Sequence, residues 1–111
     1  MTNYAGHSVQ IINVTNKAAP AFLGQILSGP AKLNQPYNIF VEGNYAYIAS
    51  YNSHAVEIVD ISNPLVPVHV AEITDNASRR LLNPIDLVKV GNYLYVTSYS
   101  EDAVAVINVT T

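Results

Sequence analysis

The hydrophobic residues of this chain recur in one short pattern that occurs three times. Each copy reads Val, any residue, two branched aliphatic residues, Asn or Asp, another branched aliphatic residue, and Ser or Thr; the copies are Val9–Thr15, Val56–Ser62 and Val104–Thr110. Successive copies start 47 and 48 residues apart. This period is typical of β-propellers, whose four-stranded blades take about 40–50 residues each.

A second pair of segments keeps the same register. Gly43–Tyr51 and Gly91–Tyr99 share the order Gly-Asn-Tyr-x-Tyr and lie 48 residues apart. Runs of Val, Ile and Tyr bounded by Gly-Asn or Pro predict short strands joined by tight turns. Four strand types, named a to d, are expected at about 37–42 and 85–90 (a), 45–51 and 93–99 (b), 8–14, 55–61 and 103–109 (c), and 21–27 and 67–74 (d).

Strand type c indicates how the sheets pack. Side chains alternate along a strand, so Val56 and Ile58 lie on one face while Val59 and Ile61 lie on the other. A strand that is apolar on both faces is expected to be buried on both faces. The predicted fold class is therefore all-β, with two four-stranded antiparallel propeller blades per chain.

The strand order c-d-a-b-c-d-a-b-c predicts one two-blade unit over residues 1–111 with an uneven end. Residues 36–74 hold a complete blade, whereas residues 84–109 hold strand types a, b and c without d. We expect a strand from residues 20–27 of a neighbouring chain to complete the second blade. One copy of strand type c is then surplus, and the pattern leaves open whether it is 8–14 or 103–109.

Two blades leave large apolar faces in water, which monomeric proteins rarely tolerate. Closed propellers have about 4–8 blades. We therefore expect homo-oligomerisation into a closed ring. Six blades in a trimer are favoured over eight in a tetramer, because fewer subunits have to close.

The segments Val56–Pro64 and Gly43–Ala49 resemble the LVIVD repeat, a β-propeller repeat named after its strand-c sequence. The likeness extends over nearly the whole chain, although Asn16 and Lys17 stand where Asn63 and Pro64 begin the following link. The resemblance implies a propeller scaffold, often in surface or secreted proteins, and supplies no family-wide catalytic residues.

Composition narrows the function classes. The net charge is −3 and the five basic residues are scattered, which disfavours a nucleic-acid binder. The chain has no cysteine, which excludes disulfides, thiolate catalysis and cysteine-ligated zinc. No apolar run approaches the roughly 18 residues of a membrane span and no secretory signal is visible. We expect no membrane insertion and, by default, a cytoplasmic location.

Asn38 and Asp86 are the candidate ligand-binding residues. Each follows a proline at the start of strand type a, the innermost strand of a blade, so a closed ring repeats them around the channel mouth. Side-chain oxygens there suit a hard cation or a polar ligand. The alternative is a local turn in which each side chain caps its own strand.

Other matched residues have a structural interpretation beside the functional one. Seven of the eight tyrosines occupy matched positions, and inter-blade packing is favoured over an aromatic binding surface. His7, His54 and Asp102 share one position of the b–c turn, where solvated turn residues are favoured over metal ligands. His69 is expected to be exposed on strand type d. The matched residues Asn13, Asp60 and Asn108 are expected to bond to the link that follows.

No Ser-His-Asp set, phosphate loop or catalytic carboxylate pair can be identified, so we expect neither an enzyme nor a cofactor or resident metal. The predicted function is a non-enzymatic, self-assembling scaffold that presents loops and a channel mouth to a protein or small ligand. One alternative is an excised or engineered fragment of a longer propeller, which the overlapping ends favour. The other, a hydrolase or lyase acting at the channel mouth, has no motif to support it.

Overall fold

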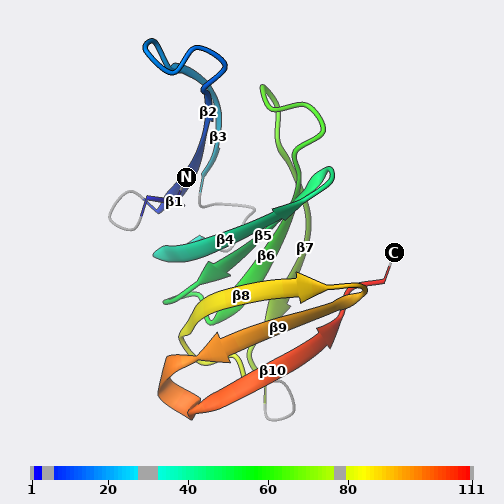
Figure 1. The fold of residues 1–111 in the computed structure, drawn as a ribbon. Coiled ribbons are helices and arrows are strands. Elements are labelled where there is room, and N and C mark those ends of the chain that lie inside the picture. Colours follow the sequence, from blue (N-terminus) through cyan, green and yellow to red (C-terminus); the bar gives the residue numbers. More distant parts are fainter. Residues whose placement is uncertain (1, 4–6, 28–32, 77–79, 111) are drawn as a thin grey trace.

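The computed structural model describes residues 2–3, 7–27, 33–76 and 80–110. Within these ranges the chain forms ten β-strands and one short 3-10 helix, with no α-helix. The strands make three antiparallel sheets that follow one another along the chain (Figure 1). The predicted all-β class with antiparallel sheets is confirmed. Within one chain the three sheets do not close into a ring.

The middle sheet has four strands in sequence order. They are β4 (Pro36–Glu42), β5 (Tyr45–Ser50), β6 (Ala55–Asp60) and β7 (Val68–Thr74). Gly43 has a φ of 60° in the turn between β4 and β5, a left-handed conformation that glycine adopts without steric cost. Strand β4 begins at Pro36, one residue before the predicted start, because proline is tolerated at the first position of a strand.

The two outer sheets have three strands each. The first comprises β1 (Thr2–Asn3), β2 (Ser8–Asn13) and β3 (Ala21–Leu27); the last comprises β8 (Pro84–Val90), β9 (Tyr93–Ser98) and β10 (Ala103–Asn108). A 3-10 turn, η1 (Tyr99–Glu101), follows β9 and was not predicted. The first sheet thus has strand types c and d with a stub of b, and the last has a, b and c. Among the described strands, β10 pairs with β9 alone.

The apolar core lies in two clusters, one on each side of the middle sheet. The first cluster comprises Val9, Ile26, Leu33, Ile48 and Val59; the second comprises Tyr47, Ala49, Val56, Leu81, Leu87, Leu94, Val96 and Ala105. Strand β6 contributes to both, because Val56 lies in one cluster and Val59 in the other. The predicted burial of strand type c on both faces is confirmed for this strand.

The two clusters are repeats of one interface. Leu33 and Leu81 lie 48 residues apart and are both fully buried at equivalent places. Val9 in the first cluster likewise corresponds to Val56 in the second. We call the face that packs on the next sheet along the chain the leading face, marked in the middle sheet by Tyr47 and Val56. The opposite face, marked by Ile48 and Val59, is the trailing face.

A buried carboxylate was not predicted. Glu57 lies on the trailing face of the middle sheet with no exposed surface, and its Oε1 contacts Nδ1 of His69 on β7. A buried charged or polar group is costly unless it has a hydrogen-bonding partner, and His69 supplies one. His69 itself is exposed, as expected for strand type d.

Candidate functional site

The structure brings Asn38 and Asp86 together. They lie at the starts of β4 and β8, and Asn38 Nδ2 donates a hydrogen bond of 2.7 Å to Asp86 Oδ1. Each Oδ1 also accepts the N–H of the next residue in its own strand, at 2.8 Å for both Ile39 and Leu87. Both side chains are exposed. A local bond to the backbone is therefore present in both copies, while ligand binding here stays a prediction.

A bulge fixes the direction of these two side chains. The pairing of β4 with β5 shifts between Pro36 and Asn38, and the pairing of β8 with β9 shifts between Pro84 and Asp86. A bulge inserts one extra residue and redirects the neighbouring side chain. Because both repeats carry it at the same position, the two polar side chains meet across neighbouring sheets.

A row of tyrosines lies at the same end of the sheets. The ring centroids of Tyr37 and Tyr51 are 5.4 Å apart, and those of Tyr51 and Tyr99 are 6.5 Å apart. The matched positions of Tyr51 and Tyr99 indicated a recurring pair. Tyr37 is the one tyrosine without a matched tyrosine, since its counterpart is Ile85, and no repeat marked it as a member of this row.

Of the other described tyrosines, two are packed between sheets and two are exposed. Tyr47 is buried in the second core cluster and Tyr45 packs against it, which confirms inter-blade packing for this pair. Their counterparts Tyr95 and Tyr93 are exposed. Tyr4 lies outside the described residues.

The b–c turn residues join one sheet to the next. His7, His54 and Asp102 all have left-handed backbone, with φ values of 52°, 51° and 49°. His7 Nδ1 accepts the N–H of Gln35 at 3.0 Å, and His54 Nδ1 accepts the N–H of Asn83 at 3.2 Å.

The interpretation of the two histidines as merely solvated turn residues needs correction. Each holds the segment that leads into the following sheet, a contact that no residue pattern within one turn reveals. Among the described residues, no three His, Asp or Glu side chains come close enough to hold a metal ion.

The residues that end strand type c bond to the following link, as predicted. The Oδ1 atoms of Asn13, Asp60 and Asn108 each accept the N–H two residues later, at 2.8, 2.8 and 2.9 Å. In the middle copy the backbone N–H and the side chain of Ser62 hold the pKa of Asp60 below its usual value.

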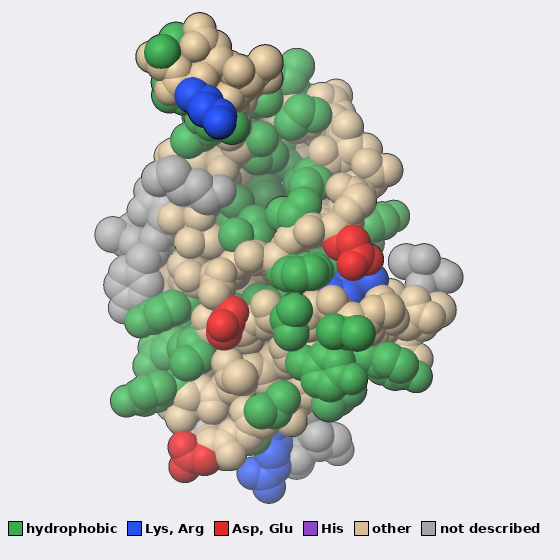
Figure 2. All heavy atoms as spheres, in the orientation of Figure 1, with side chains coloured by type: hydrophobic (Ala, Val, Ile, Leu, Met, Phe, Trp, Pro, Cys, Tyr) green, Lys and Arg blue, Asp and Glu red, His purple; other side chains and the backbone are tan. Residues whose placement is uncertain are grey.

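The leading face of the last sheet is open to solvent. Val88, Tyr95 and Val106 lie side by side on it in register and are 47%, 38% and 59% exposed. Their counterparts in the middle sheet, Phe40, Tyr47 and Ile58, belong to or pack against the second core cluster. Figure 2 shows hydrophobic side chains gathered over the lower half of the molecule, where β8–β10 lie.

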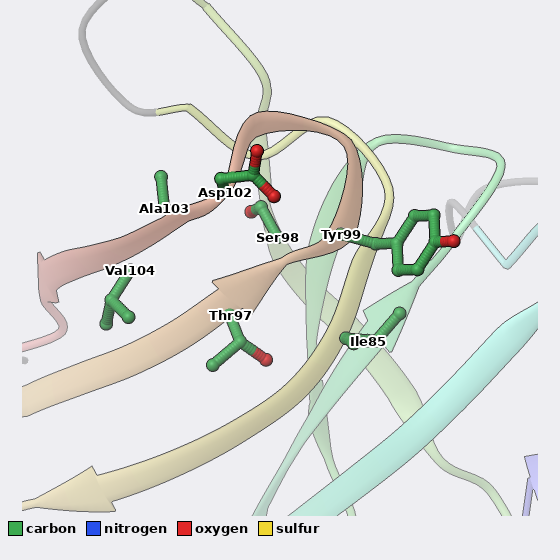
Figure 3. A pocket seen from close by; sticks show the side chains of 7 residues that line it. All are labelled: Ile85, Thr97, Ser98, Tyr99, Asp102, Ala103 and Val104. Atoms are coloured by element: carbon green, nitrogen blue, oxygen red, sulfur yellow. The ribbon is translucent and has the colours of Figure 1, made fainter.

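A hollow of about 570 Å³ lies at the end of this open face where β9 ends and β10 begins. It is lined by Ile85, Thr97, Ser98, Tyr99, Asp102, Ala103 and Val104 (Figure 3). The equivalent place on the middle sheet is covered by the segment that precedes β8. There Leu81 packs against Ala49 and Val56, and Asn83 Nδ2 donates to the carbonyl oxygen of Tyr51 at 3.1 Å.

Repeated antiparallel sheets that stack leading face on trailing face define a tandem-repeat all-β protein of propeller type. Residues 36–75 match the family model of the LVIVD repeat, a repeat found in β-propeller proteins. Residues 36–75 therefore carry the LVIVD repeat, and the resemblance seen in Gly43–Ala49 and Val56–Pro64 is confirmed. No curated protein and no solved structure matches the chain. None of the described residues belongs to a helix with the length and hydropathy needed to cross a membrane.

His54 tests the role of the b–c turn. We expect His54→Ala to lower the free energy of unfolding by about 1–3 kcal/mol, because the N–H of Asn83 loses its acceptor and alanine disfavours positive φ. His54→Asn should lose much less, since asparagine tolerates this backbone and keeps an acceptor. Urea unfolding followed by circular dichroism measures both; equal losses for the two variants would contradict the assigned role.

Asp60 tests the strand-end bond through pH. Its lowered pKa means that the bond stabilises the fold above the ordinary carboxyl pKa and that this contribution disappears as pH falls through the folded-state value. Asp60→Asn copies Asn13 and Asn108, which do not titrate. As pH falls from about 5 to about 2, the free energy of unfolding of wild type should therefore decrease relative to that of Asp60→Asn. A difference that is constant over this range would refute the account.

Proposed function

We propose that the chain is a non-enzymatic scaffold, without cofactor, that assembles with copies of itself into a closed β-propeller. The observation that carries this proposal is the open leading face of the last sheet. It repeats, position by position, the face of the middle sheet that is buried against its neighbour. Exposed apolar surface of this extent favours a protein–protein contact.

The neighbouring copy offers the matching surface. Among the described residues, the trailing face of its middle sheet packs against a first sheet that lacks strand type a and has two residues of type b, and Val41 on this face is exposed. A hollow of about 240 Å³, lined in part by Ile39 and Val41, lies beside β2 there. The segment with Leu33 and Gln35, equivalent to Leu81 and Asn83, suits the hollow at Ala103 and Val104.

Polar and apolar pairs are distributed as this assembly requires. Within the chain, Lys89 Nζ lies 2.6 Å from Glu42 Oε1, and the pair joins β8 to β4. In an assembled ring the equivalent pair between copies is Val90 of one and Val41 of the next. These two valines are 61% and 51% exposed in the single chain. An ion pair inside the chain is thus matched by an apolar pair at the proposed junction.

Head-to-tail contacts that repeat around an axis close into a cyclic ring. Each copy contributes two blades, so three copies make six blades and four copies make eight. We favour the trimer, because it is the smaller closed assembly. Further repeats in a longer chain would cover the same face, and the mass of the particle separates the two arrangements.

Closure would place the Asn38–Asp86 pair around the channel mouth once per chain. Carboxylate and amide oxygens in a ring suit a hard cation such as Ca²⁺, and the tyrosines at the same end offer apolar faces to a small ligand or a protein loop. We expect Ca²⁺ titration of the assembled protein in a calorimeter to give a binding signal that Asp86→Ala abolishes. A binding signal from Asp86→Ala equal to that of wild type would contradict a Ca²⁺ site at Asp86.

The valine pair gives a test of assembly in which a second substitution should restore what the first one loses. Val90→Glu should lower the sedimentation coefficient near the assembly midpoint, because a carboxylate would face Val41 without a partner. Adding Val41→Lys should restore it, since the two changes copy the Glu42–Lys89 pair at the junction. Val66→Glu adds the same charge at an equally exposed valine, 61% for both, and should behave like wild type. Failure of the double variant to recover would count against this junction.

A further inference from the structure

We infer that the junction blade is built by strand exchange: β8, β9 and β10 of one copy pair with β3 of the next, and β10 takes the place of β2. This rests on the proposed assembly and adds to it which of the two copies of strand type c is surplus. Equivalent positions in β2 and β10 lie 95 residues apart.

The place for β3 lies along the outer edge of the last sheet. Strand β10 has no partner on this edge among the described strands. A hollow of about 390 Å³ adjoins it, lined by Tyr47, Ile58 and Ile73 of the middle sheet and by Ile107 and Val109 near the end of β10. In the middle sheet β7 occupies the equivalent edge, next to β6. Strand β3 is the earlier copy of β7, so it is the segment that fits.

Backbone pairing does not decide between the two copies of strand type c. Strands β2 and β3 pair at six positions, and β10 has six residues to offer in the same register. Strand β3 therefore keeps its backbone pairing whether β2 or β10 lies beside it. Strand β1 adds only two pairs to β2. The choice depends on the side chains.

One side-chain pair favours β10. In the complete blade, buried Glu57 on β6 contacts His69 on β7. The counterpart of His69 in β3 is Phe22, which is 60% exposed in the single chain. The counterpart of Glu57 is Ala105 in β10 and Gln10 in β2. The residue beside Phe22 in the junction blade is therefore Ala105 if β10 is used and Gln10 if β2 is used.

The junction buries this position against the leading face of the middle sheet, where Ala105 is already part of the core. A small apolar side chain fits beside a phenyl ring, as a carboxylate fits beside a histidine. The amide of Gln10 would carry polar atoms into this apolar position, whereas the methyl group of Ala105 carries none, and burying polar atoms costs free energy that burying a methyl group does not.

The turns that precede β2 and β10 also favour β10 in the junction blade. His7 precedes β2 and accepts the N–H of Gln35. Its counterpart before β10 is Asp102, which has the same left-handed backbone and an exposed side chain. After exchange the Asp102 carboxylate would accept the Gln35 N–H of the next copy. A hydrogen bond to an ionised acceptor is stronger than one between neutral groups, so the exchange replaces His7 with a better acceptor.

Paired cysteines test the exchange, since the chain has none of its own. Gln25 on β3 lies opposite Gln10 on β2 and would lie opposite Ala105 after exchange. Under mild oxidation, Ala105→Cys with Gln25→Cys should give covalent dimers and trimers on a non-reducing gel. Gln10→Cys with Gln25→Cys should stay largely unlinked. Glu57→Cys with Glu72→Cys, an equivalent pair within the middle sheet, is the control that must link within one chain.

Linkage of the Gln10 pair within one chain at a yield equal to or above that of the Ala105 pair would overturn the inference. So would a result in which neither pair links while the Glu57 pair does. The solution mass of the same variants separates this failure from failure of the assembly. A particle of several chains with the Gln10 pair linked keeps the ring and rejects the exchange, whereas a single-chain mass rejects both.

Discussion

The structure depends on sheets that are apolar on both faces. Strand β6 shows the constraint: Val56 is buried on one side and Val59 on the other, and neither has any exposed surface. A sheet of this kind is stable only between two neighbours, because each apolar face left in water forfeits the free energy of burial. The middle sheet has both neighbours within the chain. The two outer sheets have one each, and this asymmetry, together with the absence of strand type a from the first sheet, produces the open apolar surfaces described above.

The open surfaces belong to one repeating interface. Within the chain that interface occurs twice, between the first and middle sheets and between the middle and last sheets, with Leu33 and Leu81 at equivalent places. At the ends the same positions carry residues suited to a second copy. In the proposed ring, Val90 and Val41 would replace an ion pair, and Ala105 and Phe22 would replace a buried Glu57–His69 contact. Substitutions of this kind change the polarity of a pair without changing its place, as the proposed interface between chains requires.

Much of this architecture could be predicted from the sequence, because strands, turns and repeat register are local properties. The alternation in Val56–Ile61 predicted burial on both faces, and the prolines before Asn38 and Asp86 marked two equivalent positions that proved to be in contact. Contacts between sheets were harder to predict. The hydrogen bond that His54 accepts from the Asn83 backbone does not follow from spacing, since it depends on which segment of the next repeat reaches the turn. The burial of Glu57 against His69 within the middle sheet was missed as well, because strand alternation does not show which polar side chains of two paired strands meet. The contact of Tyr37 with Tyr51 could not be predicted for a related reason: the counterpart of Tyr37 is Ile85, so no repetition singled it out.

The most direct test of the account is the mass of the wild-type particle, measured by sedimentation equilibrium across a range of concentrations. Three copies of the 12.0 kDa chain give a particle of about 36 kDa, and four give about 48 kDa. The account predicts one of these closed assemblies, with the trimer favoured, and a mass that stops rising once the ring has formed. A mass of one chain at high micromolar concentration would contradict it.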